Sequence, residues 1–155
     1  MRRSDREMTD PSLIEEFIAG EKIIRIAFFD EGDIYIVPVN YGYTCADGRY
    51  TFYFHGAKAG RKYGLAKAGP NVGFEIDGRY ELMPAETACD HSAHFMSVIG
   101  TGRLTLIEDR AAKTAALTAV MKQNTGRTEW SFDEKMLEAT AVFMLEADKL
   151  SCKAK

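Results

Sequence analysis

Short runs of β-branched and aromatic residues, separated by turn-forming residues, constrain the fold of this chain more than any other feature. Six such runs cover residues 23–29, 34–43, 49–55, 71–80, 95–107 and 140–150. Asp30-Glu31-Gly32-Asp33 and Asp47-Gly48 separate the first three runs, a pattern that predicts two successive hairpins. The sequence therefore predicts a mainly β protein with mostly antiparallel strands. A single closed β-barrel with helical inserts is the most economical way to hide the strand edges.

The helical inserts are predicted from caps and apolar periodicity. Asp10 and Pro11 are residue types that begin a helix, and Gly20 is the type that ends one. Further helices are predicted over residues 60–68, 109–123 and 133–139. Because neither a repeat nor a linker is found in the 155 residues, we expect residues 1–155 to form one domain.

Charge and hydropathy exclude several kinds of partner. The formal net charge is −3, so there is no basic excess to neutralise a nucleic-acid backbone. No apolar run approaches the ~20 residues that span a membrane, and the charged segment Met1–Met8 lacks the apolar region of a secretory signal. We therefore expect a cytoplasmic protein that binds neither nucleic acid nor membranes. Its three cysteines are too few and too widely spaced to predict a disulfide framework.

The stretch Tyr53–Lys62 has features of a phosphate site. A β-patterned run ends at His55, a turn rich in glycine and alanine follows, and Arg61 and Lys62 begin a predicted helix. Small residues let a ligand approach the backbone, and donors gather at a helix start, which suits an anion. The alternative interpretation is a solvated basic turn, which is the usual role of such a short segment.

Three other segments suit a flat, partly polar ligand. Arg25 interrupts the apolar run of Arg25-Ile26-Ala27, and Asn40 lies among β-forming residues in Pro38–Tyr43. Ser97–Gly102 is polar on one face and carries little bulk on the other. Each segment alone is more often structural than functional. Together with His55 and Gly60–Lys62 they predict one binding pocket.

Sequence motifs for other chemistries are missing or weak. The chain has no G-x-G-x-x-G between a strand and a helix, no G-x-S-x-G and no H-E-x-x-H. His91 and His94 follow Cys89, but a spacing of three places two histidines on one face only in a helix, and this segment has no helical signal. We therefore predict no metal site. Trp130 is predicted either to plug an apolar gap or to cover an aromatic ligand.

The ordered segments resemble a known family. Arg25-Ile26-Ala27 is followed by P-V-N-Y-G-Y, Y-F-H-x-A-x-x-G-R-K, N-V-x-F-E and S-V-I-G-x-G. This set is similar to the FMN-binding split-barrel superfamily of pyridoxamine 5′-phosphate oxidase-like flavoproteins, and within it to the nitroimidazole-resistance subfamily. The resemblance covers nearly the whole chain and departs from the family pattern at residues 90–96. It implies a Greek-key split barrel of six antiparallel strands that forms a homodimer, with FMN at the subunit interface.

The resemblance also implies roles for individual residues. Arg61 and Lys62 would hold the FMN phosphate, with His55 nearby as the candidate catalytic residue. The residues that would contact the rest of the flavin come from three segments of the chain: Arg25, Ile26, Ala27, Val39, Asn40, Tyr41, Ser97 and Val98. A bound phosphate should raise the pKa of His55 above its usual value near ~6.5.

Two functions follow from the resemblance. The first is an FMN-dependent oxidoreductase that acts on a small molecule, with a nitroimidazole-type nitro-aromatic as one acceptor and His55 or Tyr41 as proton donor. The second is a non-catalytic module of the same fold that binds or stores flavin or haem. The sequence names neither the physiological substrate nor the electron donor.

Overall fold

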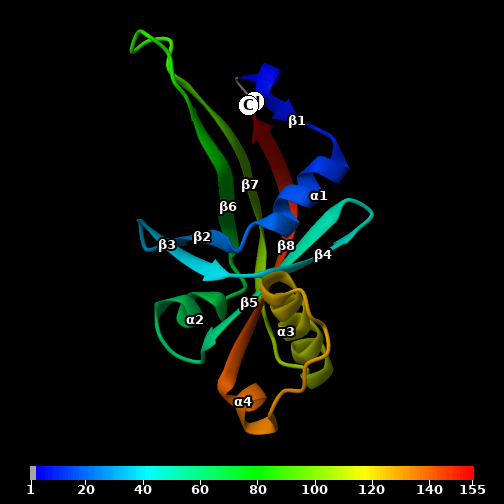
Figure 1. Ribbon diagram of the computed structural model, residues 1–155. Coiled ribbons are helices and arrows are strands. Elements are labelled where there is room, and N and C mark those ends of the chain that lie inside the picture. Colours follow the sequence, from blue (N-terminus) through cyan, green and yellow to red (C-terminus); the bar gives the residue numbers. More distant parts are fainter. Residues whose placement is uncertain (1–2) are drawn as a thin grey trace.

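The computed structural model describes residues 3–155 and contains mainly β structure (Figure 1). Eight strands are present in this part of the chain, with the following bounds: β1 Glu7–Met8, β2 Ile23–Asp30, β3 Asp33–Asn40, β4 Gly42–Ala46, β5 Arg49–Ala57, β6 Asn71–Met83, β7 Ser92–Ile107 and β8 Thr140–Ala154. The helices are α1 Pro11–Gly20, α2 Arg61–Ala66, α3 Arg110–Thr125 and α4 Glu134–Ala139, preceded by a 3-10 turn over Ser4–Arg6.

The strands form one antiparallel sheet in the order β3-β2-β6-β7-β8-β5-β4, with β1 paired to β8. This arrangement confirms the predicted split-barrel class. The prediction of a closed barrel is wrong, because within residues 3–155 the pairing ends at β3 on one side and at β4 on the other. One divided run and one additional short strand explain why eight strands occur rather than six. The run over 34–43 divides at Tyr41, and the two-residue β1 carries no periodic signal.

Both predicted hairpin turns are confirmed by the backbone. Glu31 and Gly32 have φ values of 52° and 103°, and Asp47 and Gly48 have values of 51° and 75°. Two consecutive positive φ values give a turn whose twist matches that of paired strands, and Asp-Gly favours this conformation. The hairpins β2–β3 and β4–β5 are therefore specified by local sequence.

The concave side of the sheet is filled by aromatic and β-branched side chains. Phe52 packs against Phe74 with ring centroids 5.2 Å apart, and Phe54 stacks on Phe143 at 4.9 Å. Helix α1 adds Phe17 and Ile18, both fully buried. A smaller apolar cluster lies on the other side of the sheet, where α3 and α4 cover Ile107 and Val142.

Aspartates cap three helices, and the caps at Asp10 and Asp109 confirm the prediction. The Asp10 carboxylate accepts hydrogen bonds from the Ser12 and Leu13 amides, and Asp109 and Asp133 accept from the third residue beyond them. Helix α3 then packs so closely on β4 that a Cβ atom at Gly42 would overlap the backbone of Ala119. Glycine at this position follows from that contact.

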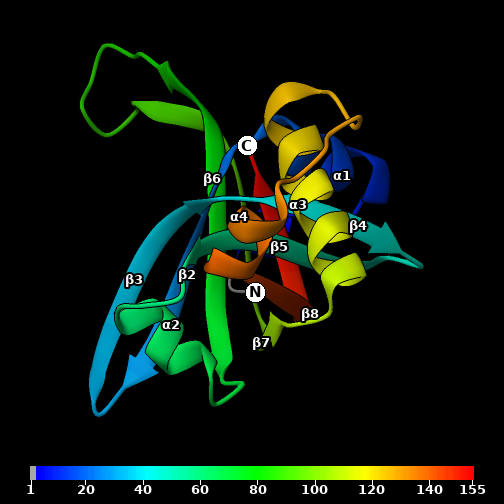
Figure 2. The ribbon, with the colours of Figure 1, turned by 90° about the horizontal axis from the view of Figure 1, so that it is seen from below.

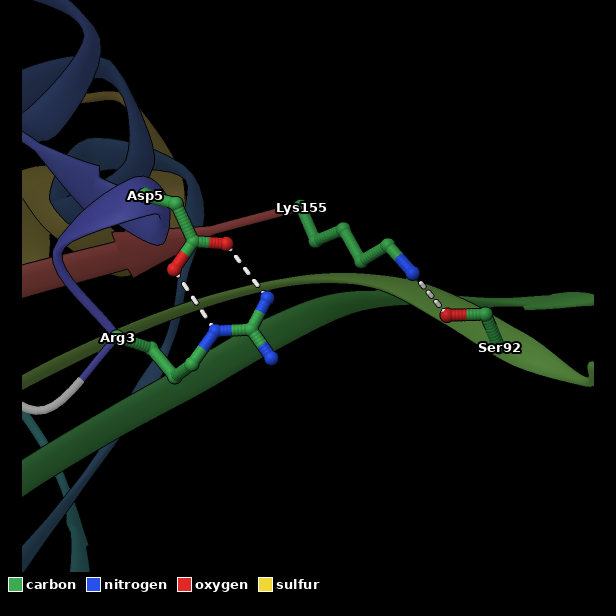
Figure 3. A network of polar contacts seen from close by, with 4 residues as sticks. All are labelled: Arg3, Asp5, Ser92 and Lys155. Carbon is green, nitrogen blue, oxygen red and sulfur yellow. Dashed lines mark hydrogen bonds and ion pairs between the residues drawn. The ribbon is translucent and has the colours of Figure 1, made fainter. Parts of the chain in front are cut away.

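The ends of β6 and β7 extend beyond the body of the domain as a long hairpin (Figures 1 and 2). The C-terminal residue Lys155 lies beside this hairpin, and its backbone carbonyl is 3.0 Å from His94 Nδ1. Lys155 Nζ donates a hydrogen bond to the Ser92 hydroxyl, and Arg3 forms an ion pair with Asp5 close by (Figure 3). In residues 3–155 no helix is long and apolar enough to cross a membrane.

Candidate functional site

His55 lies near the end of β5 on the convex face of the sheet. Alternation along the strand turns Phe52 and Phe54 into the core, whereas Thr51, Tyr53 and His55 share the opposite face. The His55 side chain is exposed, so it is not a buried core histidine. Its backbone carbonyl accepts a hydrogen bond from Lys62 Nζ at 3.4 Å, which joins the end of β5 to helix α2.

Lys62 is a half-buried cation at the start of helix α2. Its ammonium lies 5.5 Å from the ring centroid of Phe54 and 5.1 Å from that of Phe143. Within the part of the chain that the structure describes, no carboxylate lies within ion-pair distance of Nζ. Burial lowers the pKa of Lys62 from its usual value. A half-buried ammonium with only a carbonyl and aromatic faces around it is suited to bind an anion.

Gly56 leaves the space that this ammonium occupies. A Cβ atom at Gly56 would lie 3.0 Å from Lys62 Nζ, closer than nearly all real contacts. The predicted uncrowded turn is therefore found here, but the room is filled by a lysine side chain from the same chain.

Arg61 is already paired. Its Nε donates to Asp30 Oδ2 at 2.6 Å, and its guanidinium lies over the Tyr35 ring, 4.7 Å from the centroid. These contacts place α2 beside the β2–β3 hairpin (Figure 2). Asp30 and Tyr35 were not predicted as part of the site, because no local pattern indicates a partner thirty residues away.

The protein groups around His55 lower its pKa. The larger cause is desolvation of the ring by neighbouring protein atoms, although the residue is exposed overall, and the smaller cause is the positive charge of Lys62. The expectation of a raised pKa rested on a bound phosphate, whereas the protein's own residues act in the opposite direction. The lowered pKa favours the neutral imidazole, which has one ring nitrogen able to accept a proton.

Arg25 and Ala27 lie on the convex face of β2, and Ile26 between them is fully buried in the core. The Arg25 guanidinium donates to Glu75 at 3.0 Å and to Asp77 on the neighbouring strand β6. Burial raises the pKa of Glu75. Arg25, which the resemblance assigns to the flavin site, is thus held by two carboxylates.

The segment Val39–Tyr41 lies at another end of the sheet. Asn40 donates to the carbonyl of Lys22 at 3.2 Å, and Val39 packs on the edge of the core. Tyr41 is fully buried, and its hydroxyl donates to the Ile18 carbonyl at 2.5 Å. Burial raises the pKa of Tyr41, so its phenol keeps its proton.

Ser97 and Val98 face opposite sides of β7. Val98 is fully buried in the core, whereas Ser97 lines a hollow of about 250 Å³ on the convex face. Ile99, Ser151, Lys153 and Glu7 form the rest of this hollow. Strand pairing places Asp77, the partner of Arg25, directly opposite Ser97.

The structure thus divides the predicted site residues among three places. His55, Arg61 and Lys62 gather around α2; Arg25, Ala27 and Ser97 share the convex face; Val39–Tyr41 lies by α1 and α3. Ile26, Tyr41 and Val98 turn their side chains inward. Whether all of these residues contact a cofactor stays a prediction.

The remaining histidines lie on the β6–β7 hairpin. His91 Nδ1 is 2.9 Å from the Thr87 carbonyl, and His94 Nδ1 is 3.0 Å from the Lys155 carbonyl. Among residues 3–155 no three potential ligands are grouped so as to hold a metal ion. The Trp130 ring packs against Arg127, and its Nε1 donates to the carbonyl of the same residue.

Comparison with known proteins places this split barrel in a family. The sequence profile described as pyridoxamine 5′-phosphate oxidase matches residues 10–154. The chain therefore belongs to the pyridoxamine 5′-phosphate oxidase-like family. A search of curated proteins gives no match.

Several solved structures have the same fold. A candidate 5-nitroimidazole antibiotic resistance protein from Bacteroides thetaiotaomicron is 26% identical, with a TM-score of 0.81 over 96% of this chain and 86% of that one. The flavocytochrome Anf3 from Azotobacter vinelandii is 23% identical, with a TM-score of 0.80 over 100% and 72%. The FAD and haem binding protein from Mycobacterium smegmatis is 19% identical, with a TM-score of 0.84 over 97% and 73%. These likenesses show that the chain shares its fold with the three proteins.

Proposed function

We propose that this protein is an FMN-binding oxidoreductase and that Lys62 holds the flavin phosphate. The observation that carries the proposal is the half-buried Lys62 ammonium at the backbone carbonyl of His55, for which the described residues provide no carboxylate. Residues 55–67 add Lys58, Arg61 and Lys67 and contain no acidic residue, although the whole chain has a net charge of −3. A local excess of positive charge in an acidic protein favours a bound anion.

FMN fits this cluster better than FAD does. The basic residues of this part of the chain gather in one cluster, residues 55–67, which suits a single phosphate group. The terminal phosphate of FMN also carries more negative charge than one phosphate of a diphosphate ester. Lys62 offers a point charge, and Arg61 can add a planar fork if it leaves Asp30. The relatives named for FAD are under 25% identical, so they support the fold rather than the choice of flavin.

The bound flavin would supply the electron transfer, and the chain would supply position and a proton. Lys62 binds the backbone carbonyl of His55, and the His55 ring is exposed on the convex face of β5, where it can hydrogen-bond a reacting group. Tyr41 is not proposed as the proton donor, because its buried hydroxyl donates a hydrogen bond to the Ile18 carbonyl. His55 is therefore the proposed catalytic residue.

A homodimer with a flavin at each interface would unite the dispersed residues. The convex face of β2 and β3 exposes Phe29, Ile34 and Ile36, with 71%, 64% and 57% of each residue accessible. Large exposed apolar groups in one patch are typical of an interface. A partner packed on this face would cover Arg25, Ala27 and Ser97 and enclose a ligand that one chain leaves open.

The proposed substrate is a small nitro-aromatic molecule. The support is the 26% identity to the candidate 5-nitroimidazole resistance protein over most of both chains. A non-catalytic flavin or haem carrier is the second candidate, favoured by the lack of an acid–base pair around His55. Turnover of NADH or NADPH by flavin-loaded protein, with and without a nitroimidazole, separates the two.

The decisive experiment identifies the flavin and tests Lys62. Flavin released from purified protein by heat should have the mass of FMN. Lys62→Met keeps the apolar stem on Phe54 and Phe143 but removes the charge, and a charge-assisted hydrogen bond contributes roughly 1.5–3 kcal/mol. FMN affinity should fall about tenfold or more, whereas the control Lys122→Met, an exposed lysine of α3, should leave it unchanged. Release of FAD, or equal FMN affinity in both variants, contradicts the proposal.

A further inference from the structure

The β6–β7 hairpin forms an arm that its own chain leaves uncovered. Beyond the bulge between Gly78 and Glu81, β6 and β7 continue to pair up to Met83 and Ser92 and are joined by residues 84–91. The arm extends away from the body in both ribbon views (Figures 1 and 2). Two large side chains on it, Tyr80 and Leu82, are 72% and 52% exposed.

The arm is acidic as well as apolar. Residues 80–93 contain three carboxylates, Glu81, Glu86 and Asp90, and no lysine or arginine. Glu86 and Asp90 are exposed on the loop at the tip, where the Thr87 hydroxyl donates to Asp90. The tip therefore presents negative charge beside exposed apolar side chains.

The complementary surface lies at the other end of the same strand. Helix α2 and its approach, residues 55–67, carry Lys58, Arg61, Lys62 and Lys67 without an acidic residue. Lys58 and Lys67 are exposed and flank the cluster in which Lys62 is proposed to hold phosphate. These two lysines can form ion pairs with carboxylates of another molecule while Lys62 binds the phosphate.

The arm cannot reach α2 within one chain. Strand β6 has 13 residues, and at about 3.3 Å per residue it separates the two surfaces by roughly 40 Å. A two-fold axis perpendicular to β6 near its middle reverses the strand in the second copy. It brings the arm of each copy to the α2 end of the other, and both contacts form together in such an isologous pair.

The base of the arm is anchored, so the arm is presented in a defined direction. The His94 ring is 3.0 Å from the Lys155 carbonyl, and the Arg79 guanidinium donates to Glu16 of α1 at 2.8 Å. Lys155 also holds the Ser92 hydroxyl (Figure 3). Contacts at the base limit the entropy that the arm would lose on docking.

We propose that the arm of one subunit docks on the α2 cluster of the other and forms the outer wall of its ligand site. Glu86 and Asp90 of the arm pair with Lys58 and Lys67, and Tyr80 and Leu82 pack on the partner's convex face. The proposal rests on the homodimer of the proposed function. It assigns residues 80–93, which overlap the segment 90–96 where the chain departs from the family pattern, to the site of the opposite subunit.

Cross-linking through the natural cysteine at the tip tests this contact. Cys89 is exposed, and Ala59→Cys adds a thiol beside Lys58 on the other surface. A short bismaleimide should join residues 59 and 89 of different chains, as read by mass spectrometry of the linked peptides. Cys89→Ser should abolish the link, and Ala111→Cys, an exposed alanine at the start of α3, should give none.

Charge reversal checks the proposed ion pairs in the same assay. In the Ala59→Cys protein, Glu86→Lys should slow cross-linking severalfold, and adding Lys58→Glu should restore the rate. Equal rates in all three proteins overturn the assigned pairing. Glu129→Lys, on the loop after α3, serves as the matched control and should have no effect.

Mass and flavin content of the same samples separate the two proposals. A dimer that holds flavin but gives no 59–89 link overturns the arm contact and leaves the proposed function intact. A monomer overturns both the dimer and the arm contact. A link in protein that binds no flavin supports the arm contact and contradicts the proposed function.

Discussion

Replacing Asp30 by asparagine should strengthen anion binding while it weakens the fold. In the structure Asp30 holds the Arg61 guanidinium at 2.6 Å, so this carboxylate competes with any phosphate for the same donor. Asparagine keeps the shape of the side chain and removes its charge. Arg61 would then remain over the Tyr35 ring and be available to a ligand.

The magnitude follows from the exposure of the pair. The Arg61 side chain is 47% exposed and that of Asp30 is 22% exposed, so the pair is partly screened by water. Pairs of this kind contribute about 0.2–1 kcal/mol. FMN or inorganic phosphate should therefore bind up to about fivefold more tightly to Asp30→Asn. The melting temperature of the ligand-free variant should fall by no more than about 4 °C.

Calorimetric titration at low and high salt measures the affinity, and thermal unfolding measures the stability. Asp33→Asn is the matched control, because Asp33 lies in the same turn, is exposed and does not contact Arg61. The gain in affinity should shrink as salt increases. Unchanged or weaker phosphate binding by Asp30→Asn, with Asp33→Asn as reference, would refute the competition between Asp30 and the anion.

Three further outcomes are expected. His55→Ala should lower turnover of the flavin-loaded protein and leave the melting temperature of the ligand-free protein nearly unchanged, because the ring is exposed; a large loss of stability contradicts its place at the site. The lowered pKa of His55 means that the unfolded chain binds its proton more tightly, so the free energy of unfolding should fall as pH drops below ~6.5. Urea titrations of the wild type and His55→Ala should diverge in this range, with the wild type losing more. Tyr41→Phe should cost about 0.5–1.5 kcal/mol in denaturant titration, since the Ile18 carbonyl loses one donor and keeps the other, Gln123. An unchanged midpoint contradicts that role.

The sequence predicted those parts of the fold that local chemistry determines. Glycine-containing turns and aspartate caps act over a few residues, so both hairpins and the starts of α1, α3 and α4 are found where they were expected. The division of the second run, residues 34–43, at Tyr41 was missed because it depends on α3, which packs against Gly42 from elsewhere in the chain.

The site was less predictable because its partners are distant in sequence. Nothing near Arg61 indicates Asp30, and nothing near Arg25 indicates Glu75. One signal was available: period-two alternation along β2 places Arg25 and Ala27 on the face opposite Ile26. Applied to each run, this rule distinguishes side chains that can meet a ligand from those that fill the core.

The position of β8 in the sheet has a consequence for how the protein forms in the cell. This strand lies between β5 and β7 and also pairs with β1, yet it is the last element of the chain described here. During synthesis, one edge of β5 and one edge of β7 stay unpaired until residues 140–154 have left the ribosome. Unpaired strand edges can form hydrogen bonds with other chains. A stop codon or proteolytic cut within β8 should therefore send the nascent protein toward aggregation rather than toward a slightly shortened domain.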